Sequence, residues 1–192
     1  MTSLLCCAVA LAGCGGEETT GPQPPQAPEV ELPQQKTASL KEAVKTAGCE
    51  LKHPKVSGEN LHAERAFKAT DYNSNPPTSG EHTPDWYDDG VYEPGTVAEL
   101  GKLVHTLEHG RINLQYKPGT PQDTVDKLQA VVAEQADGYH FLLYENTTKM
   151  DYAVAATAWG HLVGCREVND DAFDVIRTFR EQYIDKAPEF VD

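Results

Sequence analysis

Basic side chains are scarce in this chain of 192 residues. It has 16 lysines and arginines against 30 aspartates and glutamates, which gives a formal net charge of -14 at pH 7. Nucleic-acid binding depends on lysine and arginine to neutralise phosphates. The charge balance therefore argues against a nucleic-acid partner. It is compatible with the attraction of cations, although an acidic balance is more often simply that of a soluble surface.

The sequence also lacks an apolar run of the roughly 20 residues that a membrane-spanning helix needs. The apolar run at the N-terminus, residues 4–12, is far shorter and leads into Leu11-Ala12-Gly13-Cys14. This stretch resembles the bacterial lipoprotein signal, which is cut before a cysteine that then carries lipid. No lysine or arginine precedes the run, which departs from that pattern. We expect a signal peptide at 1–13 and lipidation of Cys14; the alternative is a chance cysteine.

The segment after Cys14 has little to bury. Residues 15–35 are mainly Gly, Pro, Gln and Glu, a composition that cannot offset the entropy of ordering. We therefore expect lipidated Cys14 and a disordered tether at 14–36, followed by one globular domain at 37–192. The lipid would anchor the protein in the cell envelope, facing the periplasm or the exterior. Gly15, in place of an aspartate after the cysteine, favours the outer membrane if the host is Gram-negative.

Cysteines number only five, and Cys6 and Cys7 would leave with the signal. With Cys14 carrying lipid, Cys49 and Cys165 remain in the folded part. Disulfides persist in exported proteins, so we expect these two to be bonded. Two separate buried thiols are the alternative. A metal site is disfavoured because neither cysteine has a CxxC or CxxH neighbour.

The rest of the sequence predicts an α+β fold, a single small domain with a short, mostly antiparallel sheet packed by helices. Residues 75–95 hold four prolines and three glycines, which preclude regular structure, while their aromatic residues indicate a long ordered loop. Hydrophobic periodicity and capping patterns give the elements. Helices are expected at 38–48, 96–109, 120–136 and 170–184, and strands at 111–117, 139–144 and 152–159.

Histidines provide the candidate chemistry. His105 and His109 are four residues apart on the helix expected to end at Gly110, so their rings lie on one face about 6 Å apart, close enough to share a metal ion. His82 lies in the ordered loop that precedes this helix, and His62 lies upstream of it. Without these neighbours, a pair of surface or capping histidines would be the simpler interpretation.

Met150 is the only methionine after the start, and it is expected in a turn, where an exposed methionine has little packing role. Three imidazoles with a thioether suit copper, and imidazoles alone suit zinc equally. The predicted metal ligands are therefore His82, His105 and His109, with Met150 and His62 as additional ligands.

Residues 105–109 also match H-x-x-E-H, the inverted zincin pattern, in which a glutamate is the general base. Peptidases of that type are much larger, carry the motif inside a longer helix and take a downstream glutamate as third ligand. Here Gly110 ends the helix at once. Glu108 is better interpreted as a residue that orients an imidazole from outside the ligand set, or that caps the region.

Several long motifs together resemble the bacterial family filed as domain of unknown function 3105, over roughly residues 55–190. The resemblance implies an exported, anchored, metal-binding domain and no defined activity, and it includes the positions of His62, His82, His105, His109 and Met150. Cys49 and Cys165 are not part of it. The motifs are Tyr72-Asn73-x-Asn75-Pro76-Pro77-Thr78-Ser79-Gly80-x-His82, Gly90-Val91-Tyr92, Val104-His105-x-Leu107-Glu108-His109-Gly110, Ala158-Trp159-Gly160 and Ala187-Pro188-Glu189.

The sequence thus predicts a membrane-anchored extracytoplasmic protein that binds copper, or zinc as second choice, and handles the metal rather than catalysing a reaction. A non-metal interaction module of the cell envelope is the alternative, with the histidines forming only a hydrogen-bond network. A metallohydrolase is third, so an enzyme is the less favoured class. The sequence names no protein partner.

Overall fold

The computed structural model describes residues 28–134 and 138–189. A six-stranded sheet of order β1-β6-β5-β3-β4-β2 lies at its centre. Three of the five strand pairings are antiparallel, which confirms the α+β class and the mostly antiparallel sheet. The helices are α1 (Leu40–Ala47), α2 (Leu100–Glu108), α3 (Gln122–Ala133) and α4 (Ala172–Tyr183), with a 3-10 turn η1 (Ala69–Asp71). The strands are β1 (Glu50–Lys52), β2 (Gly90–Val91), β3 (Ile112–Tyr116), β4 (Phe141–Glu145), β5 (Val154–Ala158) and β6 (His161–Cys165).

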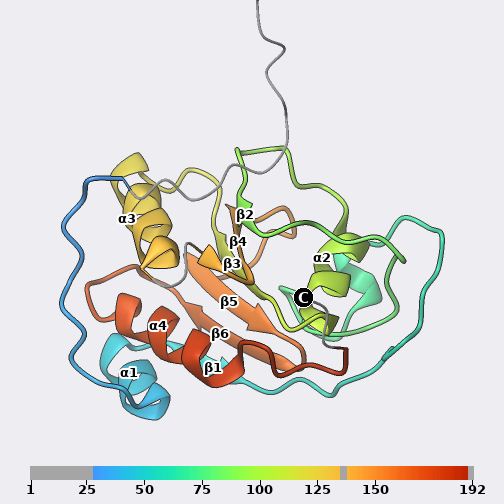
Figure 1. Cartoon of the computed structure of the whole chain (residues 1–192), viewed down its shortest axis with the longest axis horizontal. Coiled ribbons are helices and arrows are strands. Elements are labelled where there is room, and N and C mark those ends of the chain that lie inside the picture. Colours follow the sequence, from blue (N-terminus) through green and yellow to red (C-terminus); the bar gives the residue numbers. More distant parts are fainter. Residues whose placement is uncertain (1–27, 135–137, 190–192) are drawn as a thin grey trace, which may run out of the picture.

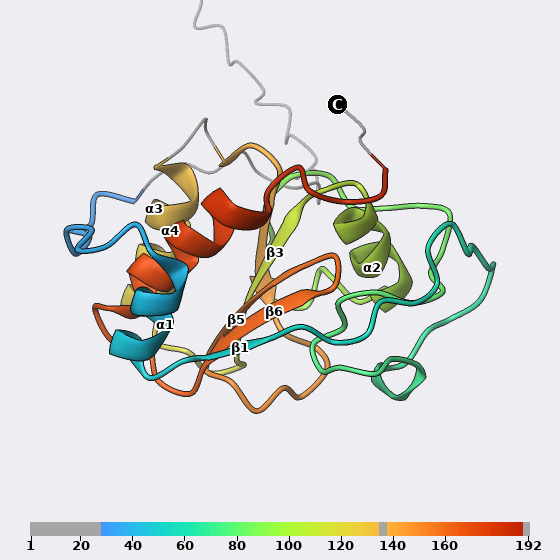
Figure 2. The same cartoon turned by 90° about the horizontal axis from the view of Figure 1, so that it is seen from below.

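The sheet has a layer on each face. Helices α1, α3 and α4 lie on one side, and α2 lies on the other with the long loops between β1 and α2 (Figure 2). Strand β3 alternates apolar and polar residues, a pattern typical of a half-buried strand. All five of its residues are buried, because Ile112 and Leu114 face the core while Asn113 faces α2 and donates to the Leu103 carbonyl at 2.8 Å. The alternation marks an apolar and a polar layer rather than core and solvent.

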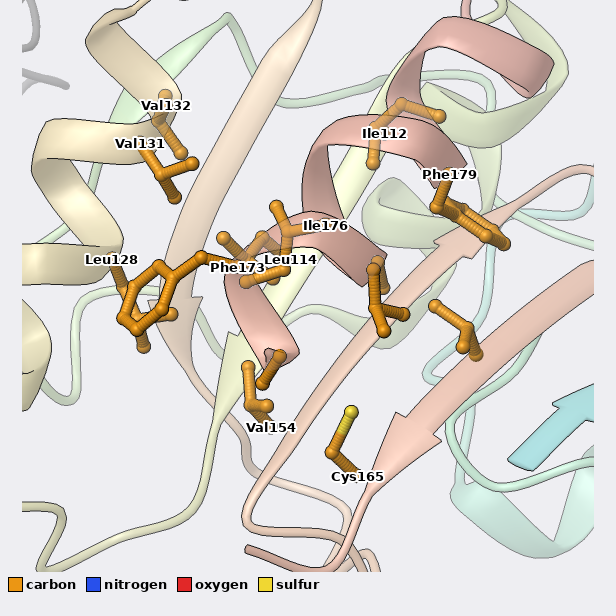
Figure 3. Packing of buried hydrophobic residues seen from close by; sticks show 14 of the residues in the cluster. Ile112, Leu114, Leu128, Val131, Val132, Val154, Cys165, Phe173, Ile176 and Phe179 are labelled. Atoms are coloured by element: carbon orange, nitrogen blue, oxygen red, sulfur yellow. The ribbon is translucent and has the colours of Figure 1, made fainter. Parts of the chain in front are cut away.

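The main core fills the space between the sheet and α3 and α4 (Figure 3). Phe173, Ile176 and Phe179 of α4 are buried against strand residues such as Leu114. Each buried side chain of this kind stabilises the fold by roughly 1.5–3 kcal/mol. This core packs against one face of the sheet, and α2 packs against the opposite face.

The ends of the helices test the capping predictions. Ser39 caps α1 by accepting a hydrogen bond from the Glu42 amide, and Gly48 ends the helix at φ 69°. Helix α2 begins four residues later than predicted. The Thr96 hydroxyl donates to the Glu93 carbonyl in a turn rather than capping the helix, and the Tyr87 hydroxyl accepts the amide of Glu99.

The sequence missed β1, β2 and β6. The first two are only three and two residues long. Strand β6 contains Gly164, a residue that usually weakens strands. A Cβ at this glycine would lie 2.4 Å from the Tyr152 ring, so the glycine makes room for a close aromatic neighbour.

Within the described ranges, no helix is long and apolar enough to cross a membrane. The predicted signal peptide, Cys14 and the first part of the tether lie outside those ranges, so these remain predictions. Of the tether residues that are described, Leu32 packs against the main core, and the Lys36 amide donates to Asp174 at 2.8 Å.

Cys49 and Cys165 form the expected disulfide and are 116 positions apart in the sequence. It joins the turn after α1 to the end of β6. Closing a loop of this length stabilises the folded state by about 4–5 kcal/mol in the chain-entropy model.

We expect the free energy of unfolding of the double variant Cys49→Ser/Cys165→Ser, measured by urea denaturation, to be lower than that of the parent by most of this amount. The parent under reducing conditions should match the variant; equal stability of oxidised parent and variant would contradict the prediction.

Candidate metal centre

Four side chains converge between α2 and the loops that cover it. The ligand atoms of His62, His82, His105 and Glu108 all lie within 4.8 Å of one another. Helix α2 supplies His105 and Glu108, and the loops supply the other two. The two loop segments are joined, since the Ala63 amide donates to the His82 carbonyl at 2.8 Å and the His82 amide to the Leu61 carbonyl at 3.0 Å. We call these four side chains the inner group.

The three imidazoles of the inner group form a nearly regular triangle. The ring centroids of His62 and His82 are 4.7 Å apart, and each lies 4.8 Å from that of His105. His82 is fully buried, His105 is nearly so, and the His62 side chain is 34% exposed. The triangle therefore has one corner open to solvent.

Backbone carbonyls fix the tautomer of two of these rings. Nδ1 of His82 lies 2.8 Å from the Gly80 carbonyl, and Nδ1 of His105 lies 2.8 Å from the Thr83 carbonyl. A carbonyl oxygen only accepts, so each Nδ1 carries the hydrogen. In the neutral rings the lone pair is then on Nε2, which faces Glu108 in the case of His82 and His109 in the case of His105. Metal-bound histidines are oriented in this way by a carbonyl or carboxylate at the other ring nitrogen.

Glu108 brings a buried negative charge to these rings. Its side chain is fully buried, and Oε1 accepts a hydrogen bond from the Asn60 amide at 2.8 Å. Oε2 lies 2.9 Å from Nε2 of His82 and 3.8 Å from Nε2 of His62. Despite the short distance, neither Oε2 nor Nε2 of His82 has a hydrogen-bond partner of suitable geometry among the described residues. The two atoms are therefore close together without being aligned for a hydrogen bond.

Such an arrangement calls for a positive charge. An ionised carboxylate in this position is strongly unfavourable without a nearby cation, and a metal ion held by the imidazoles would supply one. Two nitrogen ligands about 2.0–2.1 Å from a tetrahedral zinc ion lie about 3.3 Å apart. The distances of 2.9 and 3.8 Å from Glu108 Oε2 to the two imidazole nitrogens bracket that separation. The inner group is thus one that could hold a metal ion, with residue types that bind metals and two imidazoles in a fixed tautomer.

A second group, the outer group, consists of His105, His109 and Glu189. Nε2 of His105 lies 2.9 Å from Nε2 of His109, which lies 3.5 Å from Oε2 of Glu189. Nδ1 of His109 is buried without a partner in the described part of the chain. The exposed Trp86 ring covers the group, in edge contact with His105 and His109 at centroid distances of 5.3 and 4.8 Å. His105 belongs to both groups.

The C-terminal segment brings Glu189 to the outer group. After α4 the chain crosses to α2 (Figures 1 and 2), where the Asp185 amide donates to the Gly110 carbonyl and the Glu189 amide to the Glu108 carbonyl. Gly110 has φ 82°, and a Cβ there would lie 2.9 Å from the Asp185 Cα. This glycine therefore both ends α2 and allows the C-terminal segment to lie against it.

Burial dominates the electrostatics of the shared and outer histidines. The pKa of His105 is lowered from 6.5 to about 4, first by desolvation and then by His109, His82 and His62, against the hydrogen bond to Thr83. The pKa of His109 is also lowered, mainly by burial and next by Arg111. Neutral imidazoles are the form that binds metal.

The histidines predicted to bind metal do not all belong to one group. His82 and His109 fall in different groups, and His105 connects them; His62 belongs to the inner group. Glu108, predicted to act from outside the ligand set, presents a carboxylate oxygen directly to it.

Met150 lies in a different environment from the one expected from the sequence. It is 2% exposed and packs with Tyr152, Ala155 and Leu162, so the expectation of an exposed turn methionine without packing role is wrong. Glu189 was missed as a site residue, because only its place in the Ala187-Pro188-Glu189 motif hinted at it.

Comparison with known families gives one finding. The family model described as "Protein of unknown function (DUF3105)" matches residues 62–191, which include every residue of both groups. Neither the comparison with curated proteins nor that with solved structures gives a match.

The lowered pKa of His105 has consequences for folding. Between pH 6.5 and about 4 the unfolded chain binds a proton at this position that the folded chain does not, so the free energy of unfolding falls as the pH drops through that window. We expect ring signals of His105 in NMR spectra of chelator-treated protein to show a neutral ring at pH 5. Titration of His105 near 6.5 would contradict its burial.

Proposed function

Because the chain belongs to the DUF3105 family of unknown function, membership supplies no activity, and we propose from the site itself that the protein binds a divalent transition-metal ion through the inner group, His62, His82, His105 and Glu108. The buried Oε2 of Glu108 supports this most directly. It faces two imidazole Nε2 atoms without a hydrogen-bond partner among the described residues. A metal ion would satisfy the carboxylate and the imidazole lone pairs together.

The donor set bears on the metal. Three imidazole nitrogens and one carboxylate oxygen suit zinc, and copper(II) is also bound by imidazole. A thioether ligand would favour copper, but the Met150 side chain packs in a separate apolar cluster. We therefore place zinc first and copper(II) second.

Binding and handling of the ion fit the site better than turnover. Four protein ligands complete a tetrahedral zinc site, whereas catalytic zinc keeps a position open for water or substrate. For a hydrolase of the H-x-x-E-H type, Glu108 would have to take a proton from metal-bound water. Its Oε1 is already engaged by the Asn60 amide, and its Oε2 faces His82. Peptide cleavage that is lost in Glu108→Gln would favour the hydrolase instead.

One observation favours the interaction module as second candidate. Leu61, next to His62 in the sequence, is 56% exposed, and Trp86, whose ring contacts His109, is 42% exposed. Both offer apolar surface to a partner at the site. Metal content separates the two functions.

We expect the full chain, purified in detergent without chelator or affinity tag and then loaded with zinc, to bind one ion tightly, as measured by mass spectrometry and chelator competition. His82→Ala and Glu108→Gln should each weaken binding at least about 100-fold, since even partners outside the ligand set contribute 10–100-fold. His53→Ala is the matched control, because His53 pairs with His161 away from both groups. Sub-stoichiometric metal in the loaded parent would rule out the proposal.

We further propose that the domain is lipid-anchored in the cell envelope. The support is Leu11-Ala12-Gly13-Cys14 and the polar segment that follows. In a bacterial host, Cys14→Ser should move the protein from the membrane to the soluble fraction, or leave the precursor uncut, because a lipid anchor requires that thiol. Zinc affinity should stay unchanged, since Cys14 precedes the domain. Unaltered membrane attachment of the variant would contradict the anchor.

A further inference from the structure

We infer that His105 is a ligand shared by two overlapping metal sites, and that an ion enters at the outer group and passes to the inner group without leaving His105. The inference rests on the proposed function, because it describes how the inner site is filled. Its basis is that His105 belongs to both groups, while its Nε2 lies 2.9 Å from Nε2 of His109 and its Nδ1 is held by the Thr83 carbonyl.

One ligand atom limits the occupancy. Nδ1 of His105 is held by the Thr83 carbonyl at 2.8 Å, so only Nε2 can bind metal. An imidazole bridges two ions only by using both nitrogens. The two groups therefore cannot both hold an ion through His105 at the same time, and they act as alternative positions for a single ion.

The groups differ in donors, while each has one member that reaches solvent. In the outer group, the Glu189 side chain is 35% exposed, and His105 and His109 are buried. In the inner group, the His62 side chain is 34% exposed, and His82, His105 and Glu108 are buried. The outer group offers two nitrogens and one oxygen, and the inner group offers three nitrogens and one oxygen. An ion that enters at the outer group thus gains a ligand and loses water when it moves inward.

The transfer is a ligand exchange. The bonds from the ion to His109 and Glu189 break, those to His62, His82 and Glu108 form, and the bond to His105 persists. No electron moves. The ion exchanges one carboxylate for another, so the charge of the complex is the same at both positions, and the hydrogen bonds from Nδ1 of His82 and His105 to backbone carbonyls remain in place.

The backbone holds the two carboxylates at adjacent positions. The amide of Glu189 donates to the carbonyl of Glu108 at 3.1 Å. Glu108 sends its side chain to the inner group, and Glu189 sends its side chain to His109. The C-terminal segment therefore places the carboxylate of the outer group next to the residue that carries the carboxylate of the inner group.

Equilibrium binding of zinc to the full-length protein tests the two positions. We expect His82→Ala to retain one ion at an affinity reduced at least about 100-fold, held by the outer group. In that background, His109→Ala or Glu189→Gln should weaken binding at least tenfold further, and His105→Ala alone should weaken binding more than His82→Ala does. His53→Ala is the control, and circular dichroism verifies folding of each variant.

Kinetics test the path. In stopped-flow measurements with a zinc-binding dye, Glu189→Gln should slow both loading and release of zinc by about tenfold, because the entry position has lost one of three donors. A merely structural role of Glu189 would leave both rates unchanged.

Several results would overturn the inference while leaving the proposed function intact. These are two zinc ions bound at once by the parent, equal affinity of His82→Ala and His82→Ala/His109→Ala, or unchanged rates in Glu189→Gln. Absence of tight zinc binding in the loaded parent would instead reject the proposed function and the inference together.

Discussion

The burial of the Glu108 carboxylate among imidazoles is the interaction on which the rest of the site depends. A charged group without solvent requires a nearby positive charge and fixed hydrogen-bond donors. The Asn60 amide provides one donor, and His82 and His62 face the other oxygen. The loops that carry these residues must therefore hold them in fixed positions, and the hydrogen bonds of the His82 backbone to Leu61 and Ala63 join the two loop segments.

Two parts of the fold hold α2 in place, the sheet on one side and the C-terminal segment on the other. Beneath, Asn113 of β3 donates to the Leu103 carbonyl and accepts from the Thr106 hydroxyl, so the polar face of the sheet holds α2. Above, the C-terminal segment donates to the carbonyls of Glu108 and Gly110. Helix α2 is thus fixed on both sides at its C-terminal end, where the histidines lie. A helix C-terminus also favours nearby positive charge.

Sequence reasoning succeeded where local rules decide the structure. The caps of α1, the end of α2 at Gly110 and the four main helices follow from periodicity and from glycine. It failed where distant contacts decide: β6 contains a glycine that only the Tyr152 ring explains, and Met150 is buried by strands that the turn does not reveal. The histidines could be found by spacing. The role of Glu189 could not, because it depends on the return of the chain from α4 to α2.

The geometry of one helical turn explains why His105, and no other residue, is shared. Successive residues of an α-helix are rotated by about 100°, so Glu108 and His109 lie about 60° to one side and 40° to the other side of His105. The i, i+3 neighbour faces the inner group, and the i, i+4 neighbour faces the outer group. A longer helix would carry the chain away along the same axis. Because Gly110 ends α2 at this turn, the C-terminal segment can lie against it and bring the second carboxylate to His109.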